Sequence, residues 1–595
     1  MLSPNQYVAG KNRTIHHAIM RARDAVTAAT TKNLRCGIGD QDYIAAFDFP
    51  VLSWVWLVLE RKGVREVTIC RLKNLYANGI TIPVINCMPR RAIFDKRGAL
   101  RQGEVGSMEW FAVGIDPLLI FLERNLAGIP IISLPQLGPS LEGECCPLPP
   151  FEETFKLVAY CDDVKPAITN INDFIIADEG ASFFEQASGT RLHRDPQTNK
   201  CKFLPLGKWR RELTQDMIPT PYMKLTDTLD MVGVQLCATW SSTRRKNGDL
   251  IRQKVQTVCG RWRRGKFLPI TQRPFSINTY ALSKLWFRTG SVNFRENDFK
   301  AINSSVKKWL YSDLFFKPEE MVLFRKISDG GLGLTSSKHK SLAFLIKSFL
   351  ELAVSPSYVN SLYLNILYRI YIEKEDLPTL PLPPYYNTDF FNNIIKAIDS
   401  GCSILQMTIK QWYIFLIENE VTYDLDRKLI PCRIEKLYPY VAWNIVWSNV
   451  RLAALSNCSR SFAWKLVHKL LPVEEKLYAA SNIPSNSCKF SCPDEPIGSL
   501  EHCFFHCHLT KELGTWLHNI FKSVNSSATE SEILFLDFQN DGLLFLTVTA
   551  LQFSWAKRVV GKKATLAEFT AYLNADLKII SATKHKNIGE KVQYT

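Results

Sequence analysis

The segment FKLVAYCDDVKPAI, residues 155–168, places two adjacent carboxylates inside an apolar stretch. Asp162 and Asp163 lie between the apolar run 157–160 and Val164, a pattern that predicts a hairpin with buried strands. Like charges side by side repel each other and resist transfer out of water. Two arrangements make the pair tolerable: an ordinary exposed Asp-Asp turn, or a bound cation such as Mg²⁺, which takes carboxylate oxygens as ligands.

The composition indicates a globular chain with an anionic partner. The 595 residues are enough for several domains of about 100–200 residues each. Hydrophobic residues make up 46% and charged residues 22%, which excludes a disordered chain. A formal net charge of +16 favours binding to a polyanion, most simply a nucleic acid.

The sequence predicts an intracellular protein without a membrane span. Its 16 cysteines are scattered without a repeat, which fits a reduced chain better than a disulfide framework. The start, residues 1–13, lacks the apolar core of a signal peptide. The uncharged segment 542–556 is shorter than the roughly 18–20 residues that cross a bilayer, so we expect a buried helix there.

Periodicity along the chain predicts an α+β protein in four parts. Short β-like runs alternate with amphipathic helical segments such as 16–29 and 54–64, and helical periodicity dominates after about residue 236. A Gly-rich turn at 329–334 precedes another helix, and the Pro-rich segment 376–387 indicates a domain break. The predicted parts are 1–235, 236–375, 376–480 and 481–595.

Three polar motifs stand in order in the first part of the chain. A carboxylate leads an apolar strand, a Gly-containing turn runs into an apolar helix, and the acidic hairpin follows. The residues concerned are Asp42 with Phe47 five positions later, Arg101-Gln102-Gly103 with Ser107 near the helix start, and Tyr160-x-Asp162-Asp163.

These motifs resemble motifs A, B and C of reverse transcriptases, and their details resemble the non-LTR (LINE-type) retrotransposon group. Residues 46–48 match its AFD and residues 101–103 its RQG. Residues 200–207 and 232–234 stand where that group has its late palm segments, and GGLGL at 330–334 stands at the end of its thumb. Each motif is weak alone, whereas the ordered set is specific and covers nearly the whole chain.

The resemblance implies a right-hand polymerase fold of the α+β class. Partial fingers and a palm with a small antiparallel sheet would occupy 1–235, and a helical thumb 236–375. A helical connector, 376–480, would precede a C-terminal region, 481–595, with a zinc element and further helices. The alternative within the resemblance is another right-hand polymerase, such as a viral RNA polymerase or an intron-type maturase, which Phe47 and the C-terminal zinc element disfavour.

The implied activity is RNA-directed DNA synthesis, in which element RNA is copied into DNA at a nicked target. Two Mg²⁺ ions would be held by Asp42 and Asp162, with Asp163 alongside. The implied partners are an RNA template, a DNA primer or target DNA, and deoxynucleoside triphosphates.

The resemblance also assigns residues to the incoming nucleotide. An aromatic ring at Phe47 would exclude a 2′-hydroxyl, although a plain core Phe is the alternative. Either Lys200 or Lys202 would protonate the leaving pyrophosphate, with a solvated surface lysine equally plausible for each. The implied nucleotide-binding set is Phe47, Arg101, Gln102, Gly103, Ser107, Lys200 and Lys202.

A basic run from Thr243 to Lys266 contains Asp249 as its sole acid and is interleaved with Trp262. Phosphate neutralisation combined with aromatic contact suits a thumb that grips an RNA–DNA duplex, and a solvated basic face is the alternative. The same run also resembles a weak nuclear localisation signal, so we expect the protein in the nucleus and the cytoplasm. The candidate nucleic-acid residues are Arg244, Arg245, Lys246, Arg261, Arg263, Arg264 and Lys266.

A Cys/His cluster near the C-terminus has the spacing of a structural zinc site. Cys488-x3-Cys492-x9-His502-x4-Cys507 offers four ligands, and unligated Cys and His are the alternative. The cluster resembles the CCHC element of many non-LTR reverse transcriptases, which implies a role in nucleic-acid binding or priming. Further candidate ligands are Cys503, His506 and His508.

Two features lead to a non-enzymatic alternative. The family's polyproteins also carry a nuclease domain, and no nuclease motif is present in this sequence. Only Gln6 and Arg13 resemble the early fingers, so we expect N-terminally truncated fingers and an endonuclease missing from this chain. The alternative is therefore an inactive relic that binds nucleic acid through the basic run and the zinc element.

Overall fold

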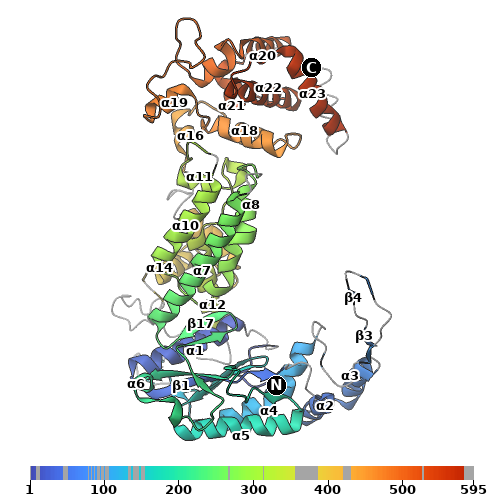
Figure 1. Ribbon diagram of the computed structural model, residues 1–595, viewed down its shortest axis with the longest axis vertical. Coiled ribbons are helices and arrows are strands. Elements are labelled where there is room, and N and C mark those ends of the chain that lie inside the picture. The colour runs from blue at the N-terminus through green and yellow to red at the C-terminus, as the bar shows by residue number, and fades with distance from the viewer. Residues whose placement is uncertain are drawn as a thin grey trace. The chain divides into compact units, whose positions relative to one another are not determined.

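The computed structural model describes most of the chain (Figure 1). The described residues are 2–8, 14–44, 51–77, 100, 106–131, 154–264, 268–312, 314–354, 386, 388–419, 430–524 and 528–581, together with short strands between 80 and 148. Two compact units are present, and each is described by itself. Unit 1 comprises Met1–Ile251, Leu285–Asp298 and Lys340–Tyr413, and unit 2 comprises Arg252–Lys284, Phe299–His339 and Ile414–Thr595.

A five-stranded sheet forms the centre of unit 1. Its order is β11-β12-β1-β14-β15, with neighbours antiparallel except for β14 and β15. The predicted α+β class is confirmed, but the expectation of an antiparallel sheet is wrong at β15. The chain leaves β14 through the short helix α6 (Trp209–Glu212) and re-enters the sheet in the same direction, a crossover that makes the pair parallel. The strands are β1 (Arg35–Asp40), β11 (Leu157–Tyr160), β12 (Asp163–Ile168), β14 (Lys202–Gly207) and β15 (Lys224–Leu225).

Helices cover both faces of this sheet, and for this reason β1 and β12 are buried over nearly their whole length (Figure 1). Helix α1 (Ile15–Thr31) lies on one face, and α4 (Ser107–Asn125) and α5 (Ile171–Ser188) lie on the other. Close packing across the strands requires glycine at Gly37, because a Cβ there would lie 2.1 Å from the ring of Phe203.

A two-stranded hairpin, β16 (Thr228–Met231) with β17 (Val234–Cys237), follows the sheet. Val232 and Gly233 both have positive φ, 49° and 88°, as the two central residues of a type I′ turn require. Unit 1 also contains α2 (Leu52–Arg61), α3 (Glu66–Ala77) and α14 (Thr388–Asp399). Along the chain, each boundary between the two units falls within a helix. These helices are α7 (Trp240–Arg264), α9 (Ser283–Thr289), α10 (Glu296–Leu310), α12 (Ser337–Ala353) and α15 (Ile409–Ile417).

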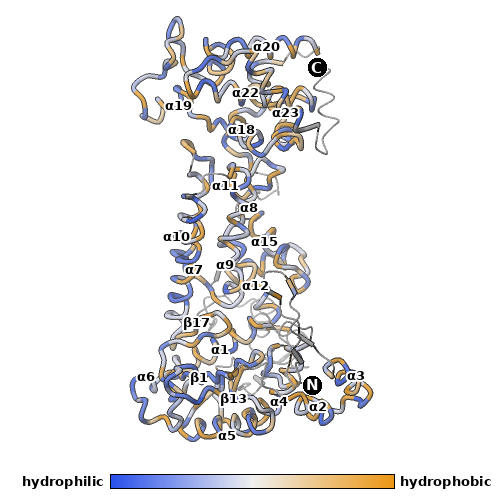
Figure 2. The backbone as a smooth tube through the Cα atoms, turned by 45° about the vertical axis from the view of Figure 1, so that its right-hand side comes forward, coloured by the Kyte–Doolittle hydropathy of each residue, from blue (hydrophilic) through white to orange (hydrophobic). Residues whose placement is uncertain are grey.

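Unit 2 is helical among its described residues, and its last helices pack around α22 (Asp541–Val559). Helices α18 (Asn457–Val467), α20 (Lys511–Ser523) and α23 (Leu566–Ser581) contact α22, and Figure 2 shows hydrophobic and hydrophilic residues alternating along them. Most of α22 is buried, which confirms the expected buried helix at 542–556. None of the described helices combines the length and apolar character that a membrane crossing needs. The remaining helices are α8 (Arg273–Ser276), α11 (Glu320–Phe324), α16 (Arg433–Leu437), α17 (Trp443–Asn449), α19 (Glu474–Ala479) and α21 (Glu530–Phe535).

Candidate functional site

The sheet brings Asp42 and Asp162 to the same end of unit 1. Asp42 follows β1, and Asp162 lies in the turn between β11 and β12, so the predicted acidic hairpin is confirmed. Strands β1 and β12 are antiparallel neighbours, and the pairing continues at Gln41, whose amide donates to the Val164 carbonyl over 3.0 Å. Because β1 ends where β12 begins, residues far apart in sequence meet at one edge.

The electrostatics of this edge favour a cation. Burial and the neighbouring charge of Asp42 raise the pKa of the Asp162 carboxyl. Asp42 is more open to solvent, with Lys200 Nζ 3.6 Å and His193 Nε2 4.0 Å from its Oδ2. Two carboxylates at one edge fit Mg²⁺, a hard ion that commonly takes one or two carboxylates and keeps sites for substrate phosphates.

Asp163 lies in a different environment from its neighbour. Lys165 Nζ is 2.5 Å from Asp163 Oδ1 and 2.7 Å from Asp40 Oδ1, and the Lys165 side chain is 1% exposed. Burial raises the pKa of Asp163 to about 6, an effect that the Lys165 ammonium opposes and Asp40 reinforces. Burial works against the charge of Lys165 too, but the two carboxylates outweigh it and raise its pKa. Asp163 is therefore paired with an internal cation, whereas Asp162 experiences the negative charge of Asp42.

Sequence reasoning missed Lys165 and Asp40. Residues two apart on a strand share a face, so Asp163 and Lys165 could have been paired from the predicted hairpin alone. Asp40 could not, because its position opposite Lys165 depends on the register of β1 against β12, in which Gly37 pairs with Ile168.

Gln6 holds the turn that carries Asp162. It is fully buried, and residues 5–7 run alongside β11, with Ala159 N donating to the Asn5 carbonyl and Tyr7 N donating to the Ala159 carbonyl. Gln6 Oε1 accepts the amide of Cys161 over 3.0 Å, and Gln6 Nε2 donates to the Cys161 carbonyl over 3.3 Å. Cys161 has φ 59°, a backbone angle that residues other than glycine rarely adopt. One side-chain amide thus satisfies both backbone groups of a strained residue directly before Asp162.

We predict that Gln6→Ala destabilises unit 1 by about 1–3 kcal/mol, because it leaves the buried amide and carbonyl of Cys161 without their partner. Urea denaturation followed by tryptophan fluorescence measures the change. Adding Cys161→Gly to this variant should recover part of the loss, since glycine adopts positive φ freely. An unchanged midpoint for Gln6→Ala would show that the two hydrogen bonds do not hold the turn.

The structure separates the candidate nucleotide residues. Lys200 lies beside Asp42, whereas Lys202 lies in β14 opposite Asp40. Ser107 is the first residue of α4 and is buried, which confirms its predicted place near a helix start. Phe47, Arg101, Gln102 and Gly103 lie outside the described residues, so their predicted roles stay predictions.

The basic run forms α7, and its cations differ in availability. Arg245, Arg261 and Arg263 are exposed. Arg244 Nε donates to the Asn293 carbonyl over 2.6 Å, and Lys246 Nζ donates to Thr228 Oγ1 over 2.7 Å. The side chain of Arg264 and all of Lys266 lie outside the described part.

Trp262, which the sequence placed among these cations, lies in an aromatic stack. Its ring centroid is 5.2 Å from that of Tyr280 and 5.7 Å from that of Trp309. The stack fixes the orientation of the last turns of α7, where Arg261 and Arg263 reach solvent.

Cys488, Cys492, His502 and Cys507 form a cluster that could hold zinc. Their ligand atoms all lie within 4.8 Å of one another, and the three sulfurs are 3.8, 3.8 and 4.0 Å apart. Zn–S bonds of about 2.3 Å in a tetrahedron place sulfurs about 3.8 Å apart, so the observed spacing fits the ion. The buried Nε2 of His502 has no hydrogen-bond partner within the described residues, which leaves it available as a zinc ligand.

The other Cys and His candidates have different neighbours. Cys503 Sγ lies 3.9 Å from Glu474 Oε2, and His506 Nε2 lies 3.0 Å from Glu530 Oε2. His508 Nδ1 lies 3.3 Å from Cys492 Sγ, outside the four-ligand cluster.

A buried ion pair lies against the cluster. Arg558 Nη2 is 2.9 Å from Glu474 Oε2 and 3.6 Å from Cys488 Sγ. A Cβ at Gly498 would lie 2.5 Å from the same Glu474 oxygen, so glycine leaves the space that this carboxylate occupies. The guanidinium of Arg558 provides positive charge next to three thiolates, which a zinc ion alone does not neutralise.

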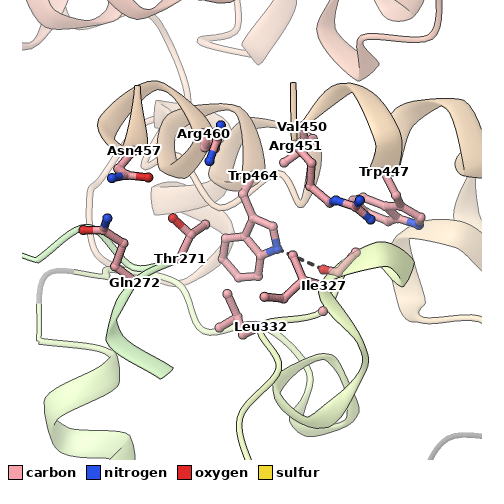
Figure 3. Close-up of a pocket in the computed structure, with 12 residues that line it drawn as sticks. Thr271, Gln272, Ile327, Leu332, Trp447, Val450, Arg451, Asn457, Arg460 and Trp464 are labelled. Carbon is pink, nitrogen blue, oxygen red and sulfur yellow. Dashed lines mark hydrogen bonds between the residues drawn. The ribbon is translucent and has the colours of Figure 1, made fainter. Parts of the chain in front are cut away.

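A pocket of about 230 Å³ lies beside the GGLGL turn, which the structure confirms as a turn (Figure 3). Trp464 points from α18 toward Leu332 and Ile327, and its Nε1 donates to the Gly330 carbonyl over 2.9 Å. Gly330 has φ 76°, and a Cβ there would lie 2.4 Å from the ring of Trp447. The floor of the pocket is thus packed aromatic core, and none of the predicted catalytic, metal or nucleic-acid residues lines it.

No family model matches this sequence, and no curated protein matches it. The features of the structure that bear on function are therefore the carboxylate edge, the Cys/His cluster and the basic helix α7.

Proposed function

We propose that this chain is an RNA-directed DNA polymerase of the non-LTR retrotransposon type. One observation carries the proposal: Asp42 and Asp162, which come from motifs far apart in sequence, lie at one end of a small sheet covered by helices, near enough for the charge of Asp42 to raise the pKa of Asp162. The motifs resemble those of reverse transcriptases, and their convergence is what two-metal nucleotidyl transfer needs.

The residues of this edge have distinct roles in the proposed reaction. Asp42 and Asp162 would hold two Mg²⁺ ions, which, when bound, activate the primer 3′-hydroxyl and stabilise the leaving pyrophosphate. Lys200, within 3.6 Å of Asp42, is better placed than Lys202 to give a proton to the pyrophosphate. Lys165 keeps the Asp40 and Asp163 carboxylates neutralised beside the site.

The basic helix and the zinc cluster support a nucleic-acid substrate. Arg245, Arg261 and Arg263 on α7 present cations to solvent, where phosphates of a duplex would release their counterions on binding. Zinc held by Cys488, Cys492, His502 and Cys507 would order residues 480–510 into a surface for the same substrate.

Primer extension tests this proposal. The purified chain receives an RNA template, a DNA primer, deoxynucleotides and Mg²⁺, beside Asp162→Ala/Asp163→Ala and the exposed control Asp227→Asn. We expect extension by the wild type and the control and none by the double variant. Salt-sensitive duplex binding without extension would contradict polymerase activity and favour the relic that only binds nucleic acid.

A further inference from the structure

A second pocket in unit 2, of about 550 Å³, contains cations that none of the roles above uses. Its wall is built by residues 316–319 before α11, by α16, by the end of α18 and by α19. Four basic residues line it against two acidic ones. The basic residues are Lys317, Arg433, Lys469 and Lys476, and the acidic residues are Glu319 and Glu475.

The two inner lysines are held in place by groups that carry no negative charge. Lys469 Nζ donates to Tyr438 Oη over 2.5 Å and lies 4.2 Å from the centroid of that ring. Lys476 Nζ donates to the backbone carbonyl of Lys469 and lies 5.5 Å from the centroid of Phe316. In the part of the chain that the structure describes, neither amine has a carboxylate within 4.0 Å.

The backbone of Lys469 is adapted to this arrangement. Lys469 follows α18 with φ 50°, in the left-handed region that a lysine rarely adopts. That conformation closes the turn by which its carbonyl reaches Lys476 and its amine reaches Tyr438. The same conformation ends the helix, because the amide of Leu470 donates to the Lys465 carbonyl over 2.7 Å.

The pocket carries more positive than negative charge, with four basic residues against two acidic ones. Burial, followed by the charge of Lys469, lowers the pKa of Lys476 to about 8, an effect that Glu475 opposes and Arg433 reinforces. Glu319 Oε2 accepts the backbone amide of Arg433 over 2.8 Å, which directs this carboxylate to the backbone rather than to Lys469 or Lys476. The remaining excess of positive charge in a partly buried pocket is costly, and an anion in the pocket would reduce that cost.

We propose that this pocket binds a phosphate group of a nucleic-acid strand through Lys469 and Lys476, with Lys317 and Arg433 at its rim. Leu437, which is 59% exposed, lines the same pocket and offers an apolar contact to the adjoining sugar or base. A strand with alternating anionic and apolar parts matches that mixed wall better than a small inorganic anion does. The proposal goes beyond the polymerase assignment, because it requires neither Asp42 nor Asp162.

Protection of the two lysines from an amine-reactive reagent tests the proposal. The full chain is labelled at pH 8 alone, with saturating single-stranded RNA, and with inorganic phosphate at the same phosphate concentration. We expect RNA to slow labelling of Lys469 and Lys476 severalfold and to leave Lys511, an exposed lysine on α20, less affected. Equal labelling of both inner lysines with and without RNA, or equal protection by inorganic phosphate, would overturn the proposal.

A charge-removal variant provides the binding readout. Lys469→Gln/Lys476→Gln should reduce the slope of the logarithm of the RNA-binding constant against the logarithm of the salt concentration by about 0.7, the value for one phosphate on a single strand. The matched control Lys511→Gln/Lys522→Gln removes the same charge from α20 and should change the slope less. The thermal midpoint of unfolding distinguishes a phosphate-binding role from a structural role for the two lysines. If their role is structural, the double variant has a lower midpoint and unchanged RNA binding, a result that would contradict the proposal.

Discussion

Removal of metal from the zinc cluster is expected to unfold the segment between α19 and α20. Loss of the ion removes the bonds that hold three sulfurs within 4.0 Å of one another. Residues 481–498 add little to the apolar core beyond Cys488, Cys492 and the half-buried Phe490, whereas Phe504 and Phe505 further on are buried, so the part of the segment before His502 is the part that opens. Structural zinc sites supply about 10–16 kcal/mol of apparent binding free energy at neutral pH, most of it as folding free energy. A strong chelator should therefore release one zinc per chain and open this segment to proteolysis.

Cysteine variants locate the ligands in the same experiment. Cys507→Ser should lose the zinc, whereas Cys503→Ser should retain it, because Cys503 faces Glu474 rather than the cluster. The exposed Cys458→Ser serves as the control for thiol loss. Wild-type protein purified without stoichiometric zinc, and equally resistant to protease before and after chelation, would contradict the site.

Asp162→Asn is expected to abolish DNA synthesis while stabilising the metal-free fold. Several kcal/mol of lost charge stabilisation correspond to a rate at least about a thousandfold lower. The pKa of Asp162 is raised in the folded state, so its ionised form lowers stability at every pH above its unfolded value. Asparagine removes that penalty, and the thermal midpoint without Mg²⁺ should rise.

Asp42→Asn should show the same loss of activity, and Lys165→Met provides the contrast. The Lys165 variant leaves Asp40 and Asp163 buried without their cation, which costs about 3–5 kcal/mol for a broken buried pair. Single-turnover extension rates and thermal midpoints measure both quantities. A midpoint that falls in Asp162→Asn as much as in Lys165→Met would show that Asp162 is structural.

Local patterns predicted the parts of the molecule that depend on neighbours in sequence. Apolar flanks predicted the hairpin at Asp162, the Cys/His spacing predicted the zinc cluster, and an uncharged apolar run predicted the buried α22. In each case the residues that decide the structure lie within about 20 positions of one another.

Features set by chain crossings and register were not predictable in this way. The parallel β15 depends on the path through α6, and the pairing of Asp40 with Lys165 depends on the register of β1 and β12. Gln6 reaches Cys161 only because residues 5–7 lie along β11, and no local sequence pattern predicts that pairing. The lysine pocket likewise joins four separate segments whose cations are unremarkable in sequence.

Divalent-ion binding at the carboxylate edge tests the central claim most directly. Mn²⁺, titrated into the full chain with its zinc retained, is followed by electron paramagnetic resonance in the wild type, in Asp42→Asn/Asp162→Asn and in the control Asp227→Asn. We expect saturable Mn²⁺ binding in the wild type and the control, competed by Mg²⁺ and lost in the double variant. Identical titration curves for all three proteins would contradict a metal site at Asp42 and Asp162, and with it the proposed polymerase.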